Sequence, residues 1–115
     1  MTRSRFALVL VLLAVVALVA ACGKGDRNAS PAATNTVVMK DSEFRPNHVS
    51  VPAGTAVSWR NDDAFEHNVV FAEGRASETL LGGGSYQRTF DEAGTFDYEC
   101  TIHPGMVGRV TVTES

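Results

Sequence analysis

The sequence predicts an all-β fold, a small antiparallel Greek-key β-sandwich, for the chain beyond residue 35. Short apolar segments alternate with turn residues, no stretch carries the apolar stripe of a helix, and about seven segments fit within about 80 residues. Early Pro or Asp and late Gly mark turns at 52–54 and 91–94. Residues 73–84, "EGRASETLLGGG", receive no assignment. We expect strands at 36–40, 47–51, 55–60, 67–72, 85–90, 95–99 and 107–113.

Strand periodicity predicts the core of the sandwich, because successive residues of a strand point to opposite faces of a sheet. In the second segment, Val49 and Val51 take the inner face, so His48 should point outward. In the third segment, Trp59 shares the phase of Val57 and is predicted to be a core residue.

The same periodicity places three possible metal ligands on the inner face. The phase of Phe71 turns His67 inward at the start of its strand, and the phase of Tyr98 extends to Cys100. The inward phase of the last strand, followed back through a glycine, reaches Met106. We therefore expect one imidazole and two sulfur atoms to point toward the inside of the domain.

The N-terminus has the features of an export segment. Arg3 and Arg5 precede an uncharged apolar run that ends in V-A-A-C at Cys22. Small residues before a cysteine resemble the lipobox of bacterial lipoproteins, in which that cysteine is lipidated and becomes the mature N-terminus. We expect residues 1–21 to be a lipoprotein signal peptide. An uncleaved anchor is the alternative, although the run is short for a spanning helix, which needs about 20 apolar residues. Either way the rest of the chain leaves the cytoplasm and stays at a membrane.

Composition divides the remaining chain into two parts. Residues 22–35 are small and polar and predict a flexible tether, and residues 36–115 form the domain. Without residues 1–21 the chain keeps 8 basic and 13 acidic residues, since two of the 10 basic residues are removed, and its formal charge is −5. This acidic balance argues against a nucleic-acid partner, because phosphate binding needs a basic face.

Cys100 is the residue that most needs an explanation. If Cys22 carries lipid, Cys100 has no disulfide partner in a chain with two cysteines. An unpaired thiol in an oxidising compartment is either an inert buried residue or a metal ligand. In "FDYECTIHPGMVGRV", His103 follows at the third position after Cys100 and Met106 at the sixth. This spacing favours the metal ligand.

With His67, these side chains make up the donor set of a blue-copper site, which is trigonal His₂Cys with a weak axial Met. Zinc also binds Cys and His, but structural zinc sites rarely use a thioether, so copper is favoured. A binuclear purple copper centre would need a second cysteine in the loop, and none is present. His48 and Met39 are rival ligands that we leave out, because His48 should point outward and Met39 has no other donor nearby.

Two stretches, "DDAFEHNVVFAEG" and "GTFDYECTIHPGMVGRVTV", resemble the copper-binding segments of plastocyanins and of the cupredoxin family generally. The preceding framework "FRPNHVSVPAGTAVSWRND" is also similar, so the resemblance covers nearly all of residues 36–113. It implies one copper ion per chain, cycling between Cu(I) and Cu(II), with His67, Cys100, His103 and Met106 as ligands. It also implies that Asn68 ties the two ligand segments together by hydrogen bonds and supports the thiolate.

One spacing departs from the plastocyanin pattern. Plastocyanins usually place four residues between the second histidine and the methionine, whereas only Pro104 and Gly105 separate His103 from Met106. The short loop is similar to that of amicyanins, so the partner and the reduction potential do not follow from the resemblance. In the family the loop histidine reaches the surface within an apolar rim, for which Pro104, Gly105, Pro52 and Ala53 are the candidates.

The resemblance implies a one-electron carrier, and the N-terminal segment predicts that it works at the outer face of a membrane, either periplasmic or at the cell surface. We expect a monomer held by its lipid anchor, with redox proteins as transient partners. The alternative is a copper storage or delivery module, although such sites tend to be exposed and rich in methionine. Enzymes of this family use additional histidine-rich copper centres, and only His48 is left over, so we do not expect catalysis.

Overall fold

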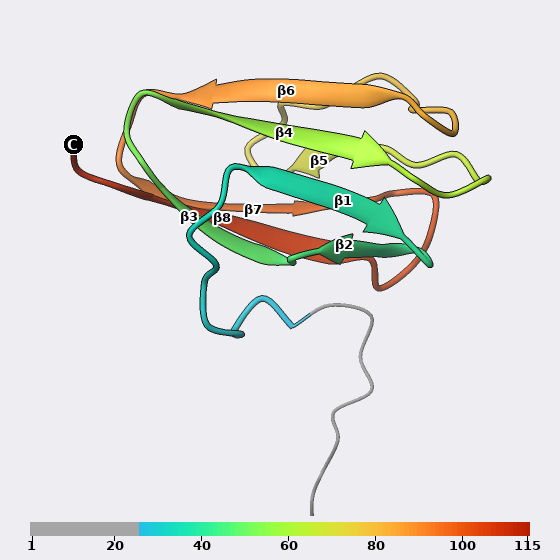
Figure 1. Ribbon diagram of the computed structural model, residues 1–115, viewed down its shortest axis with the longest axis horizontal. Coiled ribbons are helices and arrows are strands. Elements are labelled where there is room, and N and C mark those ends of the chain that lie inside the picture. The colour runs from blue at the N-terminus through green and yellow to red at the C-terminus, as the bar shows by residue number, and fades with distance from the viewer. Residues whose placement is uncertain (1–25) are drawn as a thin grey trace, which may run out of the picture.

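Two β-sheets pack face to face in the computed structural model, which describes residues 26–115 (Figure 1). The expected signal peptide, residues 1–21, and the lipidated Cys22 lie outside the described residues. No helix in the described part could span a bilayer. The first sheet has the order β2-β1-β4-β6, with β1 (Thr36–Lys40), β2 (Glu43–Arg45), β4 (Thr55–Asn61) and β6 (Ser85–Phe90). The second has the order β3-β8-β7-β5, with β3 (His48–Pro52), β5 (Val70–Phe71), β7 (Gly94–Glu99) and β8 (Val107–Thr113).

The predicted two-sheet sandwich is confirmed, and the pairing of its strands is mixed rather than wholly antiparallel. β1 pairs with β4 and β3 pairs with β8 in parallel, while the other four ladders are antiparallel. Parallel neighbours need a crossover connection. Here the crossovers arise because the chain changes sheet between β2 and β3 and again between β3 and β4.

Two strand predictions need correction. The strand expected at 67–72 is reduced to β5, because His67 forms only an isolated bridge with Leu80. β2 was not predicted, since it has three residues and two of them are charged. It pairs with β1 across a tight turn in which Asp41 and Ser42 have φ of 52° and 55°.

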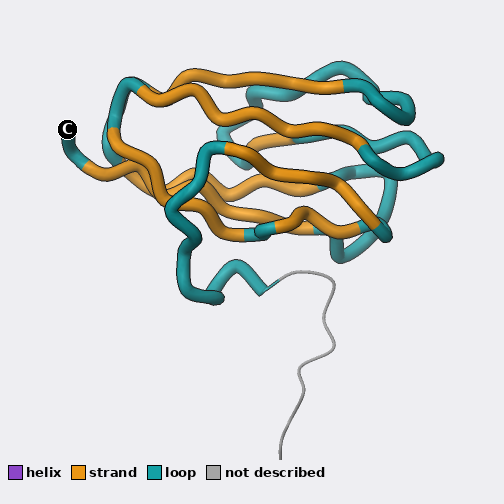
Figure 2. The backbone as a smooth tube through the Cα atoms, viewed as in Figure 1, coloured by secondary structure: helices purple, strands orange, loops and turns teal. Residues whose placement is uncertain are grey.

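The core contains the residues that the strand period predicted. Trp59 is fully buried and makes edge contacts with Phe71 and Tyr98, at ring-centroid distances of 5.8 and 5.4 Å. Val49 and Val51 are also buried, as expected. The connecting loops gather at the two ends of the sandwich (Figure 2). One end collects the loops 62–69, 79–84 and 100–106, together with the β1–β2 turn.

Residues 26–35 are docked on the domain, which corrects the expectation that 22–35 is a flexible tether throughout. Ala32 forms a parallel bridge to Val49, through its N–H to His48 O at 2.9 Å and its carbonyl to Ser50 N at 2.9 Å. Arg27 donates to the carbonyls of Tyr98 and Gly108 at 3.0 and 3.1 Å. This segment therefore extends the second sheet at its edge strand β3, and its first residues reach across to β8 and β7 (Figure 1).

His48 faces away from the core, as its phase predicted, but the docked segment covers it. Its ring nitrogens lie 2.8 Å from Ala29 O and 2.7 Å from Thr111 Oγ1, and only 9% of the residue is exposed. Both nitrogens are thus engaged in the link between the N-terminal segment and β8.

An ion pair between β7 and β8 gives a prediction about acid stability. Arg109 Nε donates to Asp97 Oδ1 at 2.6 Å, and this hydrogen bond holds the pKa of Asp97 below 3.8. The stabilisation is therefore present above pH 3.8 and is lost as the pH falls through the lower pKa of the folded state. Asp97→Asn should lower the free energy of unfolding by about 0.5–1 kcal/mol at pH 7, because the pair is partly exposed. In urea unfolding, the difference from the native sequence should shrink between pH 4 and pH 2. An equal difference at both pH values, or an equal loss in the exposed control Asp91→Asn, would contradict this reading.

Candidate metal centre

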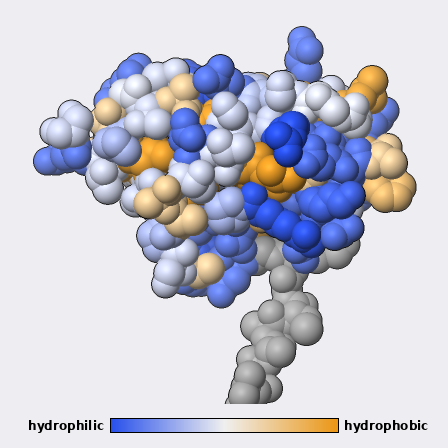
Figure 3. Space-filling view, viewed as in Figure 1, coloured by the Kyte–Doolittle hydropathy of each residue, from blue (hydrophilic) through white to orange (hydrophobic). Residues whose placement is uncertain are grey.

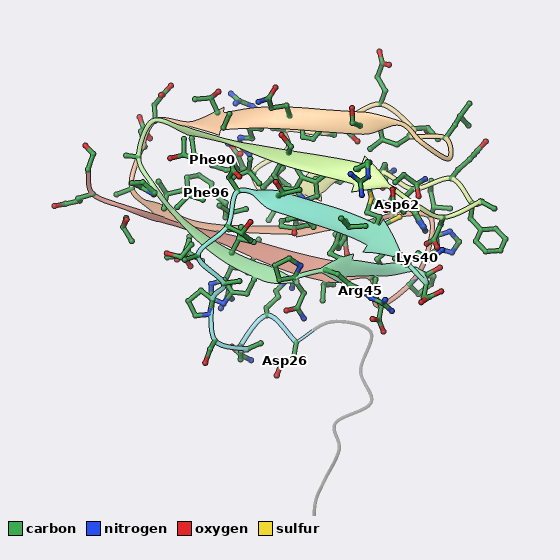
Figure 4. All side chains as sticks on the ribbon, viewed as in Figure 1. Asp26, Lys40, Arg45, Asp62, Phe90 and Phe96 are labelled. Carbon is green, nitrogen blue, oxygen red and sulfur yellow. The ribbon has the colours of Figure 1, made fainter. Side chains whose placement is uncertain are left out.

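Four residues from two separated segments gather at the loop end of the sandwich. His67 lies in the loop that follows β4, Cys100 directly follows β7, and Met106 directly precedes β8. His103 lies in the middle of the loop between these two sulfurs. Figure 4 shows Lys40 and Asp62 at this end of the molecule, whereas Phe90 and Phe96 lie toward the opposite end.

His67 is fully buried and held from two sides. Its backbone exchanges hydrogen bonds with Leu80, at 3.1 and 2.7 Å. Its ring Nε2 lies 2.8 Å from Asp63 Oδ2, and its Nδ1 lies 3.8 Å from Cys100 Sγ. The ring thus uses one nitrogen for a carboxylate and directs the other at the thiol.

The loop 100–106 is closed by its own backbone. Cys100 N donates to Met106 O at 2.9 Å, and Met106 N donates to His103 O at 3.3 Å. Gly105 takes a φ of +82°, which the tight turn requires. Cys100 is 3% exposed and has no disulfide, and Met106 is fully buried. The two sulfur-bearing residues therefore face the inside from adjacent positions of the β7–β8 pair.

His103 is the half-buried member of the set. Its ring centroid lies 4.8 Å from that of His67, and its Nε2 lies 3.2 Å from the carbonyl of Glu66. That contact orients the outer nitrogen of His103 toward the loop 62–69. Phe65, which is 63% exposed, lies 6.5 Å from the His103 ring.

Asn68 joins the two segments. Its Nδ2 donates to Thr101 Oγ1 at 2.8 Å, and its Oδ1 accepts from Thr101 N at 2.8 Å. The Asn68 amide thus uses both its donor and its acceptor on Thr101. Because His67 precedes Asn68 and Cys100 precedes Thr101, these two hydrogen bonds fix the distance between His67 and Cys100.

Sequence reasoning missed two residues of this end, Asp63 and Asn61. Fully buried Asn61 donates to the carbonyls of Phe65 and Leu80 at 2.7 and 2.9 Å and accepts from Asp63 N at 2.9 Å, so it shapes the loop before His67. Burial alone raises the pKa of Asp63, but hydrogen bonds from Ser42 N, the His67 ring and Asp41 N outweigh it and lower the pKa to about 2. The only indication in the sequence is the four-residue spacing from Asp63 to His67.

The separation of one pair of donor atoms, Cys100 Sγ and His67 Nδ1, fits a small first-row metal ion. Bond lengths of first-row metals to these donors are similar, and for zinc they are about 2.3 Å to a thiolate sulfur and about 2.0 Å to an imidazole nitrogen. At the sulfur–metal–nitrogen angle of about 120° of a trigonal site, these bonds place the sulfur and the nitrogen about 3.7 Å apart. The observed separation of Cys100 Sγ and His67 Nδ1 is 3.8 Å. Across residues 26–115, no group of three or more Cys, His, Asp or Glu side chains is already arranged to hold a metal ion. The ligand set therefore rests on these pairwise contacts and on shared burial.

One rival ligand, His48, and part of the expected rim lie away from this site. Met39 is fully buried in the core and His48 is engaged under the N-terminal segment. Pro52 pairs with Thr113 at the last position of β8, which is the end of the sandwich opposite Met106. Pro52 and the following Ala53 therefore cannot border His103, and this expectation was wrong because the sequence does not reveal the parallel pairing of β3 with β8.

Comparisons with known proteins agree on one family. The family model described as a cupredoxin-like domain matches residues 9–112. The chain is similar to amicyanin-alpha of Methylorubrum extorquens, at 34% identity over 113 residues that cover 93% of this chain and 95% of the relative. It is also similar to plastocyanin of Scenedesmus fuscus, at 40% identity over 83 residues that cover 60% and 85% of the two chains. Among solved structures, the Cu(I) form of a methionine-to-alanine mutant of amicyanin matches with a TM-score of 0.66 and 32% identity, covering 74% of this chain and 87% of that one.

Proposed function

This chain belongs to the cupredoxin family, and we propose that it is a blue-copper protein that carries one electron at a time. His67, Cys100, His103 and Met106 would hold a single copper ion. The observation that carries this proposal is the 3.8 Å contact between His67 Nδ1 and Cys100 Sγ, which brings together two segments 33 residues apart. A bound copper ion would supply the Cu(I)/Cu(II) couple.

The residues around the proposed site form a rigid, preorganised arrangement. The His67 ring is hydrogen-bonded to a carboxylate, the loop 100–106 is closed by backbone bonds, and Asn68 holds the two segments together. Ligands fixed in this way move little when the charge of a bound ion changes, and small movement favours fast electron transfer. The same burial argues against the alternative of copper storage or delivery, since a cargo ion needs an accessible route of exchange.

The face around His103 is suited to a transient partner. Three exposed apolar side chains come from the loops of this end, with exposed fractions of 63% for Phe65, 62% for Leu81 and 41% for Ile102. Figure 3 shows orange and tan side chains at this end of the molecule. We propose that redox proteins dock here and that His103 passes the electron.

We also propose that the chain works outside the cytoplasm as a monomer anchored by lipid on Cys22. This rests on the apolar run and the V-A-A-C motif. Mass spectrometry of the mature protein purified from membranes should find Cys22 as a diacylated N-terminus. An intact Met1, or a Cys22→Ala variant that stays with the membranes, would contradict the anchor.

Titration of the metal-free domain with Cu(II) tests the function. We expect binding to saturate at one equivalent, an intense visible band that bleaches on reduction, and an electron-spin spectrum with the small copper hyperfine splitting typical of a thiolate-bound site. A colourless oxidised complex, or one that loses its copper within minutes to a chelator, would contradict the electron carrier. Rapid loss would instead favour delivery.

A further inference from the structure

We propose that Asp63 is the residue that positions His67, and that the β1–β2 turn in turn positions Asp63. The inference rests on the proposed copper site and extends it to a residue outside the predicted ligand set. It assigns a role to a carboxylate four residues before His67 and to a turn that carries no predicted ligand.

The Asp63 carboxylate is buried and is surrounded by hydrogen-bond donors. Its side chain is 5% exposed, and its two oxygens receive three hydrogen bonds. Oδ1 accepts from Asp41 N at 2.8 Å, and Oδ2 accepts from Ser42 N at 2.9 Å and faces His67 Nε2 at 2.8 Å. Lys40 Nζ lies 4.0 Å from Oδ1. A buried carboxylate with this many donors is held in one orientation.

The turn that supplies two of these donors is conformationally unusual. Asp41 and Ser42 both have positive φ, at 52° and 55°, where residues other than glycine are uncommon. This backbone directs two successive N–H groups at a single carboxylate. Backbone strain of this kind persists where the surroundings compensate for it, and the Asp63 carboxylate is that compensation.

The consequence for His67 is a fixed tautomer. An ionised carboxylate can only accept, so it selects the imidazole form with the proton on Nε2. The lone pair then lies on Nδ1, the atom that faces Cys100 Sγ at 3.8 Å. Carboxylates that orient metal-binding histidines in this way also increase their basicity, and their loss typically weakens metal binding about 10–100-fold. The negative charge should in addition favour Cu(II) over Cu(I).

The first measurement uses the unaltered chain without metal. Nitrogen-15 NMR of the histidine rings should find the proton of His67 on Nε2 at neutral pH. A proton on Nδ1 would overturn the proposal. This result does not depend on copper. A chain that bound no copper would overturn the proposed function, but the NMR measurement would still decide whether Asp63 sets the tautomer of His67.

The second measurement compares Asp63→Asn with the matched control Asp62→Asn, whose exposed carboxylate pairs with Arg60. Asp63→Asn should bind Cu(II) about 10–100-fold more weakly in a chelator competition, raise the reduction potential and lose the single His67 tautomer. Asp62→Asn should leave all three unchanged. If Asp63→Asn matches the native sequence in affinity, potential and tautomer, Asp63 has no positioning role. If Asp63→Asn does not fold, the tautomer in the unaltered chain decides alone.

Discussion

Cys100→Ser should abolish the visible colour of the copper-loaded domain. The colour of a blue-copper site comes from charge transfer between the cysteine thiolate and Cu(II), and an alcohol is a harder and much weaker donor. Cys100 is 3% exposed and has no disulfide, so the substitution changes the donor atom without breaking a covalent link. Absorption spectra of both proteins, loaded with one equivalent of Cu(II), provide the measurement.

The control is Met106→Leu, which removes the other sulfur. A thioether in the axial position bonds weakly, so this variant should stay coloured with a shifted band. Both variants keep an apolar or nearly isosteric side chain at a buried position, and circular dichroism should find their sheet content unchanged. A Cys100→Ser protein that keeps the band would show that the thiol is not a ligand. The inert buried cysteine would then be the better reading.

The strand period was enough to place the buried part of the candidate site. Alternation along β7 and β8 put Cys100 and Met106 inside, and both are buried. It also put His67 inside, although the strand expected there is mostly loop. The prediction succeeded because the isolated bridge to Leu80 keeps His67 in the phase of the strand that follows.

The parts that could not be predicted depend on contacts between distant segments. An acidic residue next to another acidic residue is usually solvated, so apart from the four-residue spacing to His67 nothing in "NDDAFEH" separates buried Asp63 from exposed Asp62. The difference comes from two N–H groups of a turn more than 20 residues away. The docking of residues 26–35 was missed for a similar reason. Arg27 donates to backbone carbonyls of β7 and β8. Every residue has a backbone carbonyl, so the amino-acid sequence does not indicate which carbonyls will bind an arginine.

The packing of β8 against Tyr98 gives the largest expected effect on stability. Gly108 lies opposite Tyr98 in the β7–β8 ladder, and the tyrosine ring occupies the space where a Cβ would be. A Cβ at residue 108 would lie 2.6 Å from Tyr98 Cε2 and nearer still to Cζ and Oη. The ring cannot move aside freely, because it is 1% exposed and is in edge contact with Phe44 and Trp59 at centroid distances of 4.7 and 5.4 Å. Gly108→Ala should therefore cost about 3 kcal/mol of unfolding free energy, the upper part of the usual range for overpacking.

Urea unfolding of the metal-free domain measures this cost, and two further variants identify its cause. Gly54→Ala adds a Cβ with nothing within 4 Å at a φ of +89°, so it should cost about 1–2 kcal/mol from backbone strain alone. Tyr98→Leu removes the ring, and combining it with Gly108→Ala should cost less than the sum of the two single changes, since the clash is then absent. Additive costs would mean that the loss at residue 108 comes from the strand backbone. Because Gly108 is two residues from Met106, Gly108→Ala should also shift the visible band of the copper-loaded protein, whereas Gly54→Ala, at the opposite end of the sandwich, should not.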